Sequence, residues 1–151
     1  MNSYNGFTPA QRMKAYEWLK EQWRLGTRQK GTKCRVCGQT RGVLMAHSED
    51  YSEPYGDHIG RYTLCFICHM MIHCRFRCPE KFAAYARIVS NGGRFEALRG
   101  HDWEAFRAKF LVASALPPCR QTGEPNTMLA TILQEGRERR WAPGSSAMGG
   151  W

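Results

Sequence analysis

The chain has 151 residues, enough for one domain with a modest core and an extension, but too few for two independent domains. Its 22 Lys and Arg residues outnumber 13 Asp and Glu residues, and the net charge of +9 favours a polyanionic partner. No run approaches the roughly 18 apolar residues of a membrane span, and the first residues lack the apolar core of a signal peptide. We therefore expect a cytoplasmic protein that does not enter a membrane.

The first half of the chain predicts a helix, two short strands and a second helix. Thr8 and Pro9 are a typical helix opening, with a hydroxyl at the N-cap and proline at the first helical position, and Gly26 ends the helical pattern. A short apolar run predicts a strand that ends at His47, and a second strand leads into the sequence CFICH after a long polar loop. The predicted elements are a helix at 8–25, strands at 43–46 and 61–64, and a helix at 69–77.

The second half predicts mostly helices. Pro79 opens either a continuation of the preceding helix or a new helix to Val89, and the sequence Asn-Gly-Gly at 91–93 ends it. Asp102 is a candidate cap for a helix at 103–113, on which three aromatic residues form an apolar stripe that predicts core packing. A short helix at 126–135 and a basic tail follow. The stripe consists of Trp103, Phe106 and Phe110.

Seven cysteines include two Cys-x-x-Cys pairs, Cys34 with Cys37 and Cys65 with Cys68. In a reducing compartment such pairs indicate metal ligands rather than disulfides, and four thiolates form the closed tetrahedral shell of a structural zinc site. The alternative is two unrelated pairs of buried thiols. Because 27 residues separate Cys37 from Cys65, the intervening segment must carry its own hairpin. Cys74, Cys78 and Cys119 stay outside this shell and are expected to be ordinary thiols.

The histidines suggest a second metal site beside the cysteines. His69 follows the last cysteine of the pairs, and His73 comes four residues later, so that on a helix both imidazoles share one face and can bind one divalent cation. The first predicted strand delivers His47.

These motifs together resemble the zinc-containing HNH nucleases of the ββα-metal fold, particularly their phage-type members. The resemblance rests on the first Cys-x-x-Cys, a strand ending in His47 before EDYSEP, and a second strand ending in LCFICHMMIH, and it covers about residues 33–73. It implies an α+β fold with a small ββα-metal core and a four-Cys structural zinc site, surrounded by several helices. The implied parts are an N-terminal helix at 1–28, the zinc-stabilised ββα-metal motif at 29–78, a helical extension at 79–116, and a short helix with a basic, partly flexible tail at 117–151.

The resemblance also implies site residues. His69 and His73 take the helical metal-ligand positions, and the four paired cysteines take the structural zinc positions. His47 fits two registers. In one it binds the metal and Ser48 stands where many members have the base; in the other Ala46 replaces the ligand and His47 is the base. No asparagine lies between His47 and Cys65, although the family is named partly for one there.

Other residues of the loop could supply a missing base. His58 is the first candidate, because neutral imidazole exchanges protons near pH 7, and Tyr51 and Tyr55 are others. Arg61, Arg75 and Arg77 flank the expected site and are predicted to contact phosphate.

The resulting expectation is a metal-dependent endonuclease of a phage, plasmid or restriction system. It would hydrolyse phosphodiester bonds of double-stranded DNA with structural Zn²⁺ and a second divalent cation such as Mg²⁺ or Mn²⁺. A homodimer would provide two sites for two strands. The first alternative is a catalytically inactive HNH-like zinc module that acts as a DNA-binding or regulatory protein. The second is a structural zinc protein whose basic surface meets a protein partner.

Overall fold

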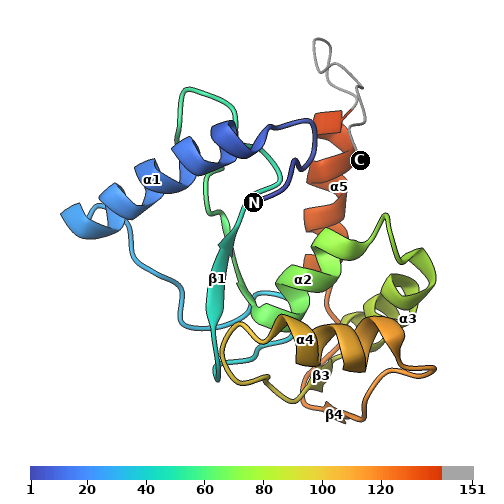
Figure 1. The fold of residues 1–151 in the computed structure, drawn as a ribbon. Coiled ribbons are helices and arrows are strands. Elements are labelled where there is room, and N and C mark those ends of the chain that lie inside the picture. Colours follow the sequence, from blue (N-terminus) through green and yellow to red (C-terminus); the bar gives the residue numbers. More distant parts are fainter. Residues whose placement is uncertain (141–151) are drawn as a thin grey trace. The chain divides into compact units, whose positions relative to one another are not determined.

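The structure, a computed structural model, describes residues 1–140 and is of mixed α+β type (Figure 1). Its described residues form two compact units: the first comprises residues 1–30, 46–62 and 130–140, and the second comprises residues 31–45 and 63–129. Within residues 1–140, no helix is both long and apolar enough to cross a bilayer. Most of the predicted basic tail, from residue 141 onward, lies outside the described part of the chain.

Helix α1 runs over Pro9–Leu25, as the sequence predicts. The Thr8 hydroxyl accepts a hydrogen bond from the Gln11 backbone amide. The Gln11 side-chain oxygen in turn accepts one from the Thr8 backbone amide, and the two bonds together form a capping box. Gly26 ends the helix at φ 72°, a left-handed conformation that suits glycine.

The first unit has a small apolar core under α1. Ala15 and Leu19 of the helix and Ile59 of the polar loop are almost completely buried together. Four aromatic residues and one alanine pack around them: Trp18, Trp23, Ala46, Tyr51 and Tyr55. The long loop is therefore held against the helix.

Strands β1 (Leu44–His47) and β2 (Tyr62–Cys65) pair in a two-stranded sheet, which is the hairpin that the spacing of the cysteines requires. The chain enters β2 through Gly60, whose φ is 62°. A Cβ atom there would lie 2.4 Å from Cδ2 of Leu19, so both the backbone conformation and the space demand glycine.

Helix α2 spans Phe66–Cys74, and the predicted range 69–77 is wrong at both ends. The helix begins immediately after β2, so that Cys68 already lies in its first turn. Phe66 and Ile67 are buried, and burial of these apolar side chains fixes the early start.

A new helix, α3 (Pro79–Ser90), then begins at Pro79, and Asn91 ends it. Two strands that the sequence does not predict follow: β3 (Gly93–Phe95) and β4 (Cys119–Gln121) pair antiparallel, with Arg94 opposite Arg120. Three residues each are too few to show a period of two, and β4 is exposed along its length.

The aromatic stripe enters the core of the second unit, as predicted, for two of its three members. Phe106 and Phe110 are buried with ring centroids 5.3 Å apart, and Phe95 of β3 meets Phe110 edge-on. Trp103 is 40% exposed, although it stacks on Phe106. The expected helix at 103–113 is a short α4 (Trp103–Phe106) that continues as a π-helix, η1 (Arg107–Val112).

The last helix, α5 (Met128–Arg140), starts two residues later and ends five residues later than the predicted range of 126–135. In the first unit, the hydroxyl of Tyr62 donates a hydrogen bond to Glu135 of this helix, and the Arg61 guanidinium lies 3.5 Å from the same carboxylate.

Candidate metal centre

The four paired cysteines come together in the second unit. Their sulfur atoms all lie within 4.8 Å of one another, and the sulfurs of Cys37 and Cys65 are 3.7 Å apart. Metal–sulfur bonds of about 2.3 Å place tetrahedral ligands about 3.8 Å apart, which matches this distance. All four thiols are free of disulfides. This cluster could therefore hold a structural metal ion.

The crowding of these sulfurs changes their acidity. The pKa of Cys34 lies well below its usual range, because the thiols of Cys37, Cys65 and Cys68 hydrogen-bond to its sulfur. The pKa of Cys65 is raised, chiefly by its hydrogen bond to Cys34, and burial raises the pKa of Cys68. A bound cation would favour the thiolate form of all four cysteines.

The first cysteine pair is shaped by a tight turn. The Cys34 amide donates to the Gln39 carbonyl at 2.8 Å, and the Gly38 amide donates to the Cys34 carbonyl at 2.9 Å, with Gly38 at φ 75°. The turn is also joined to the start of β2, because the Arg35 amide donates to the Thr63 carbonyl at 2.8 Å. These bonds set the direction of both thiols.

Strand β3 supports this turn from the other side. The side-chain amide of buried Gln39 donates to the Phe95 carbonyl at 3.2 Å, and the Arg94 guanidinium donates to the Gly38 carbonyl at 3.0 Å. Arg94 and Phe95, which lie outside the part of the chain that resembles HNH nucleases, therefore help to hold the cysteine turn.

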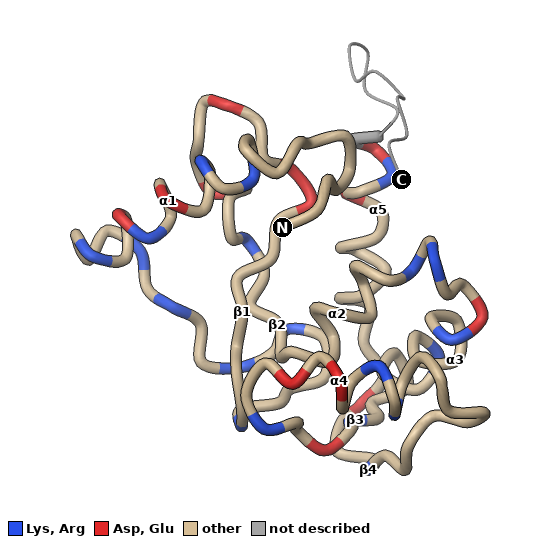
Figure 2. Tube along the Cα trace, in the orientation of Figure 1, with Lys and Arg blue, Asp and Glu red and all other residues tan. Residues whose placement is uncertain are grey.

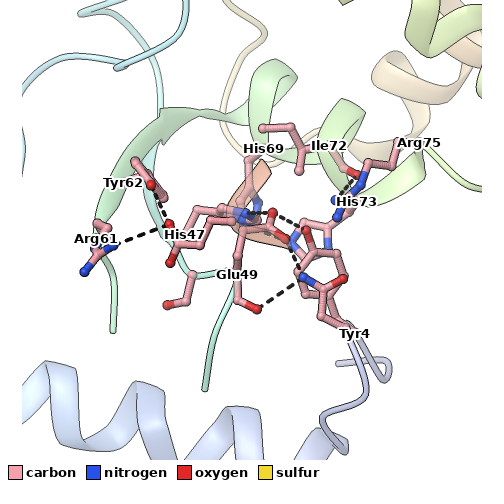
Figure 3. A network of polar contacts seen from close by, with 12 residues as sticks. Tyr4, His47, Glu49, Arg61, Tyr62, His69, Ile72, His73 and Arg75 are labelled. Atoms are coloured by element: carbon pink, nitrogen blue, oxygen red, sulfur yellow. Dashed lines mark hydrogen bonds and ion pairs between the residues drawn. The ribbon is translucent and has the colours of Figure 1, made fainter. Parts of the chain in front are cut away.

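His69 and His73 meet on one face of α2, as the four-residue spacing predicts (Figure 3). Their Nε2 atoms are 3.2 Å apart, and their ring centroids are 4.5 Å apart. Two bonds of about 2.1 Å to one cation, at an angle near 100°, separate the two nitrogens by about 3.2 Å. The pair therefore has the geometry for binding one divalent ion.

His47 lies at the end of β1 in the first unit and is completely buried. Its Nε2 atom is 2.7 Å from Oε1 of Glu49, which is also completely buried and accepts a hydrogen bond from the Tyr4 hydroxyl at 2.6 Å (Figure 3). Neither Glu49 nor Tyr4 is predicted as a site residue from the sequence. The sequence contains a glutamate two residues after the histidine, but it does not say that both side chains point the same way.

Ser48, the alternative occupant of the base position, is buried and accepts a hydrogen bond from the Gly60 amide at 2.7 Å. A serine hydroxyl in this position fixes the turn before β2. It has no basic group with which to take a proton from water.

The candidate bases in the loop are distributed differently. His58 is half-buried, with Nε2 at 2.9 Å from the Ser52 carbonyl. Burial raises the pKa of Tyr51 above its ordinary value, and burial together with Glu53 raises the pKa of Tyr55. A phenol with a raised pKa is a poor base at neutral pH, so His58 remains the better of these candidates.

The three predicted phosphate-binding arginines have different surroundings. Arg77 is exposed, whereas Arg75 is buried, donates to the Ile72 carbonyl at 2.9 Å and lies over the ring of Phe76. Arg61 is exposed and lies near Glu135. Their role toward phosphate stays a prediction.

A larger basic stretch follows α1 and was not singled out from the sequence. Residues 24–41 contain six Lys and Arg residues and no Asp or Glu residue. Figure 2 shows these cations along the connection between α1 and β1. Five of them are exposed: Arg24, Lys30, Lys33, Arg35 and Arg41.

Aromatic and basic side chains also alternate on the second half of α1. They line a hollow of about 400 Å³, in which Lys30 lies over the ring of Trp23 at 4.9 Å. Lys20 and Arg24 each pair with a glutamate one turn earlier, at 2.8 Å and 2.6 Å. The residues that line the hollow are Tyr16, Lys20, Trp23, Arg24 and Lys30.

The remaining thiols lie outside the four-Cys cluster. Cys74 is buried, Cys78 is half-buried and Cys119 is exposed. Burial raises the pKa of Cys74.

No protein-family profile, no curated protein and no solved structure matches this chain.

Proposed function

We propose that the chain is a metal-dependent DNA endonuclease of the HNH type. The observation that carries this proposal is the order of elements around the cysteine cluster: β1 ends in His47, a long loop leads to its partner β2, and α2 follows at once with His69 and His73. A first strand that ends in a histidine, a paired second strand and a helix that carries two histidines are what the ββα-metal architecture requires.

The four-Cys cluster is proposed to hold Zn²⁺. Thiolate ligands favour zinc among the common divalent ions, and a closed shell of four is typical of structural sites. The 3.7 Å separation between Cys37 and Cys65 supports this assignment. Because α2 begins one residue after Cys65, zinc would fix the first turn of the helix that carries both histidines.

The second cation is proposed to bind His69 and His73 of the second unit, and the resemblance to HNH nucleases implies His47 as a further ligand. A divalent ion there would act as a Lewis acid toward the scissile phosphate and the departing 3′ oxygen. The imidazoles of His69 and His73 would hold it from one helix face, and Nε2 at 3.2 Å from Nε2 suits that task. His47, anchored by Glu49, would be the third ligand, and His58 is then the candidate for taking the proton from water.

The DNA partner is proposed from the charge distribution. The basic stretch at residues 24–41 holds six positive charges and no Asp or Glu residue, and Arg24 among the six forms an ion pair with Glu21 of α1. Phosphate contacts from Lys and Arg supply most non-specific affinity for DNA. The aromatic residues that line the hollow on α1 could stack on bases if a strand is unpaired there.

Ser48 favours one second candidate, a zinc module that binds DNA without cutting it. In the register in which His47 binds metal, the base position holds a buried serine whose hydroxyl is engaged by the Gly60 amide. Such a protein would keep the cysteine site and the basic stretch but would not hydrolyse DNA.

The purified protein should be incubated with supercoiled plasmid and Mg²⁺, Mn²⁺ or Ni²⁺, together with His47→Ala, His69→Ala and His58→Ala. His101→Ala is the matched control, because His101 is exposed and outside the histidine set. We expect nicking or linearisation that falls at least a hundredfold in His69→Ala and His47→Ala, and stays within twofold in the control.

Absence of cleavage with every ion, while DNA binding persists, would contradict the nuclease and support the binding module. In that case log affinity should fall with log salt at a slope of about −0.9 for each neutralised phosphate. Reversal of two exposed charges in the basic stretch, Lys33→Glu and Arg35→Glu, should weaken binding and reduce this slope. A flat salt dependence would contradict DNA as the partner.

A further inference from the structure

The carboxylate of Glu49 is buried in the first unit among polar groups that point toward it. Oε1 accepts from the Tyr4 hydroxyl at 2.6 Å and lies 2.7 Å from Nε2 of His47, and the Asn5 amide donates to Oε2. The same Asn5 amide donates to the Glu49 backbone carbonyl at 3.2 Å. Because a buried carboxylate without hydrogen-bond donors is strongly unfavourable, these donors make the complete burial of Glu49 tolerable.

A tight turn near the N-terminus aims two of these donors. Tyr4 and Phe7 exchange backbone hydrogen bonds of 3.0 Å and 2.9 Å, and the two residues between them, Asn5 and Gly6, have φ of 50° and 81°. Asn-Gly is the favoured pair for a turn with two positive φ values, so the sequence itself dictates this geometry. The Arg12 guanidinium lies over the Tyr4 ring at 5.3 Å and helps to hold it.

We propose that Glu49 is a positioning residue for His47. As a carboxylate it accepts a hydrogen bond from Nε2–H of His47, and this bond holds the neutral imidazole in the tautomer whose lone pair is on Nδ1. His47 would therefore act through Nδ1, whether as a metal ligand or as a base. Carboxylates that accept a hydrogen bond from a metal-binding histidine fix the orientation of its ring in this manner and raise its basicity. The role of Nδ1 toward a metal ion rests on the proposed function, whereas the predicted tautomer of His47 does not.

The tautomer can be measured directly by long-range ¹H–¹⁵N correlation NMR on the zinc-replete protein without a second cation, at a pH where His47 is neutral. We expect a protonated-type shift for Nε2 and a lone-pair-type shift for Nδ1 of His47. A proton on Nδ1 would overturn the proposal, independently of any cleavage assay.

Glu49→Gln tests the carboxylate itself, because the side chain keeps its size while its amide can donate to Nε2. We expect a changed tautomer ratio at His47 and a 10-fold to 100-fold loss of affinity for Mn²⁺ or Ni²⁺ in calorimetric titration. Glu53→Gln is the matched control: Glu53 is a loop carboxylate that pairs with exposed Lys14 at 2.6 Å, and its removal should leave both readouts unchanged.

The two proposals fail separately. If plasmid is not cut but His47 carries its proton on Nε2 and changes tautomer in Glu49→Gln, Glu49 still positions His47 and only the nuclease is contradicted. If Glu49→Gln keeps the wild-type tautomer and affinity, the positioning role is wrong even when the enzyme cuts DNA. If Glu49→Gln does not fold, the tautomer of the wild-type protein still decides.

Discussion

At the scale of single residues, polar side chains that are buried beside β1 and β2 carry most of the local order. Glu49 is surrounded by hydrogen-bond donors, Ser48 holds the turn at Gly60, and Tyr62 binds Glu135. Glu49, Ser48 and Tyr62 are only 0–6% exposed, whereas Glu135 is partly exposed. Loss of one partner in such a pair costs more than loss of an exposed hydrogen bond, because the remaining group stays desolvated.

Tyr62 predicts a specific loss of stability at alkaline pH. Burial and the hydrogen bond to Glu135 raise its pKa from 10.0 to about 12. Below pH 10 both the folded and the unfolded state keep the proton; between pH 10 and 12 the unfolded state ionises first, so the free energy of unfolding falls. Tyr62→Phe has no hydroxyl at this position to ionise. Its free energy of unfolding, lower than that of the wild type at neutral pH, should therefore approach the wild-type value by on the order of 1 kcal/mol as the pH rises to about 11.5.

The measurement is urea unfolding of both proteins at several pH values between 7 and 11.5. Tyr16→Phe, which removes a partly exposed hydroxyl from α1, is the control for loss of any phenol and should show a constant difference from wild type. A constant difference for Tyr62→Phe as well would contradict the role of its hydrogen bond.

At the scale of elements, β3 and the cysteine turn depend on each other. The sequence shows the turn at Cys34 and Cys37, but nothing in residues 93–95 marks them as its support. The side chain of Gln39 makes the connection, since its amide donates to the Phe95 carbonyl and its oxygen accepts from the Arg41 amide at 3.1 Å. Residues beyond 79 are therefore part of the scaffold of the four-Cys cluster.

Gln39→Ala should destabilise the second unit by about 1–3 kcal/mol, because it leaves the buried Phe95 carbonyl without its donor. We also expect faster transfer of zinc to a colorimetric chelator. Gln29→Ala, at an exposed position of the neighbouring segment, is the matched control. Equal stability and equal rates of zinc transfer in the two variants would show that β3 does not support the turn.

At the scale of the whole molecule, the four-Cys cluster joins segments that are distant in the sequence. Cys34 and Cys37 come from a loop, Cys65 from the end of β2 and Cys68 from α2. Apparent zinc binding free energies of about 10–16 kcal/mol are comparable to or larger than the total stability of a small domain. The metal should therefore decide whether this part of the chain folds.

Cys34→Ser should lose the bound zinc and the near-UV circular dichroism of the folded aromatic core. Cys119→Ser, at an exposed thiol outside the cluster, should keep one zinc per chain and an unchanged thermal midpoint. Elemental mass spectrometry and circular dichroism test both statements. A Cys34→Ser protein that keeps its zinc and its thermal midpoint would contradict the four-Cys site.

The sequence by itself determined the features that depend on local spacing and on turn chemistry. It predicted α1 between Thr8 and Gly26, the hairpin between the cysteine pairs, and the face shared by His69 and His73. It also predicted a helical segment opening at Pro79, but not whether that segment continues the preceding helix. For the helices and the histidine pair the determining contacts lie within a few residues of one another, so periodicity and capping residues suffice. The hairpin followed instead from the spacing of the two cysteine pairs.

Only the tertiary structure decided which distant groups meet. Strands β3 and β4 are too short to carry a pattern, α2 begins early because Phe66 is buried, and the aromatic stripe divides into two core residues and an exposed tryptophan. Glu49 is the clearest case, because its partner Tyr4 lies 45 residues away in the sequence. Burial of a carboxylate and its compensation by donors are properties of the folded chain, and no local pattern encodes them.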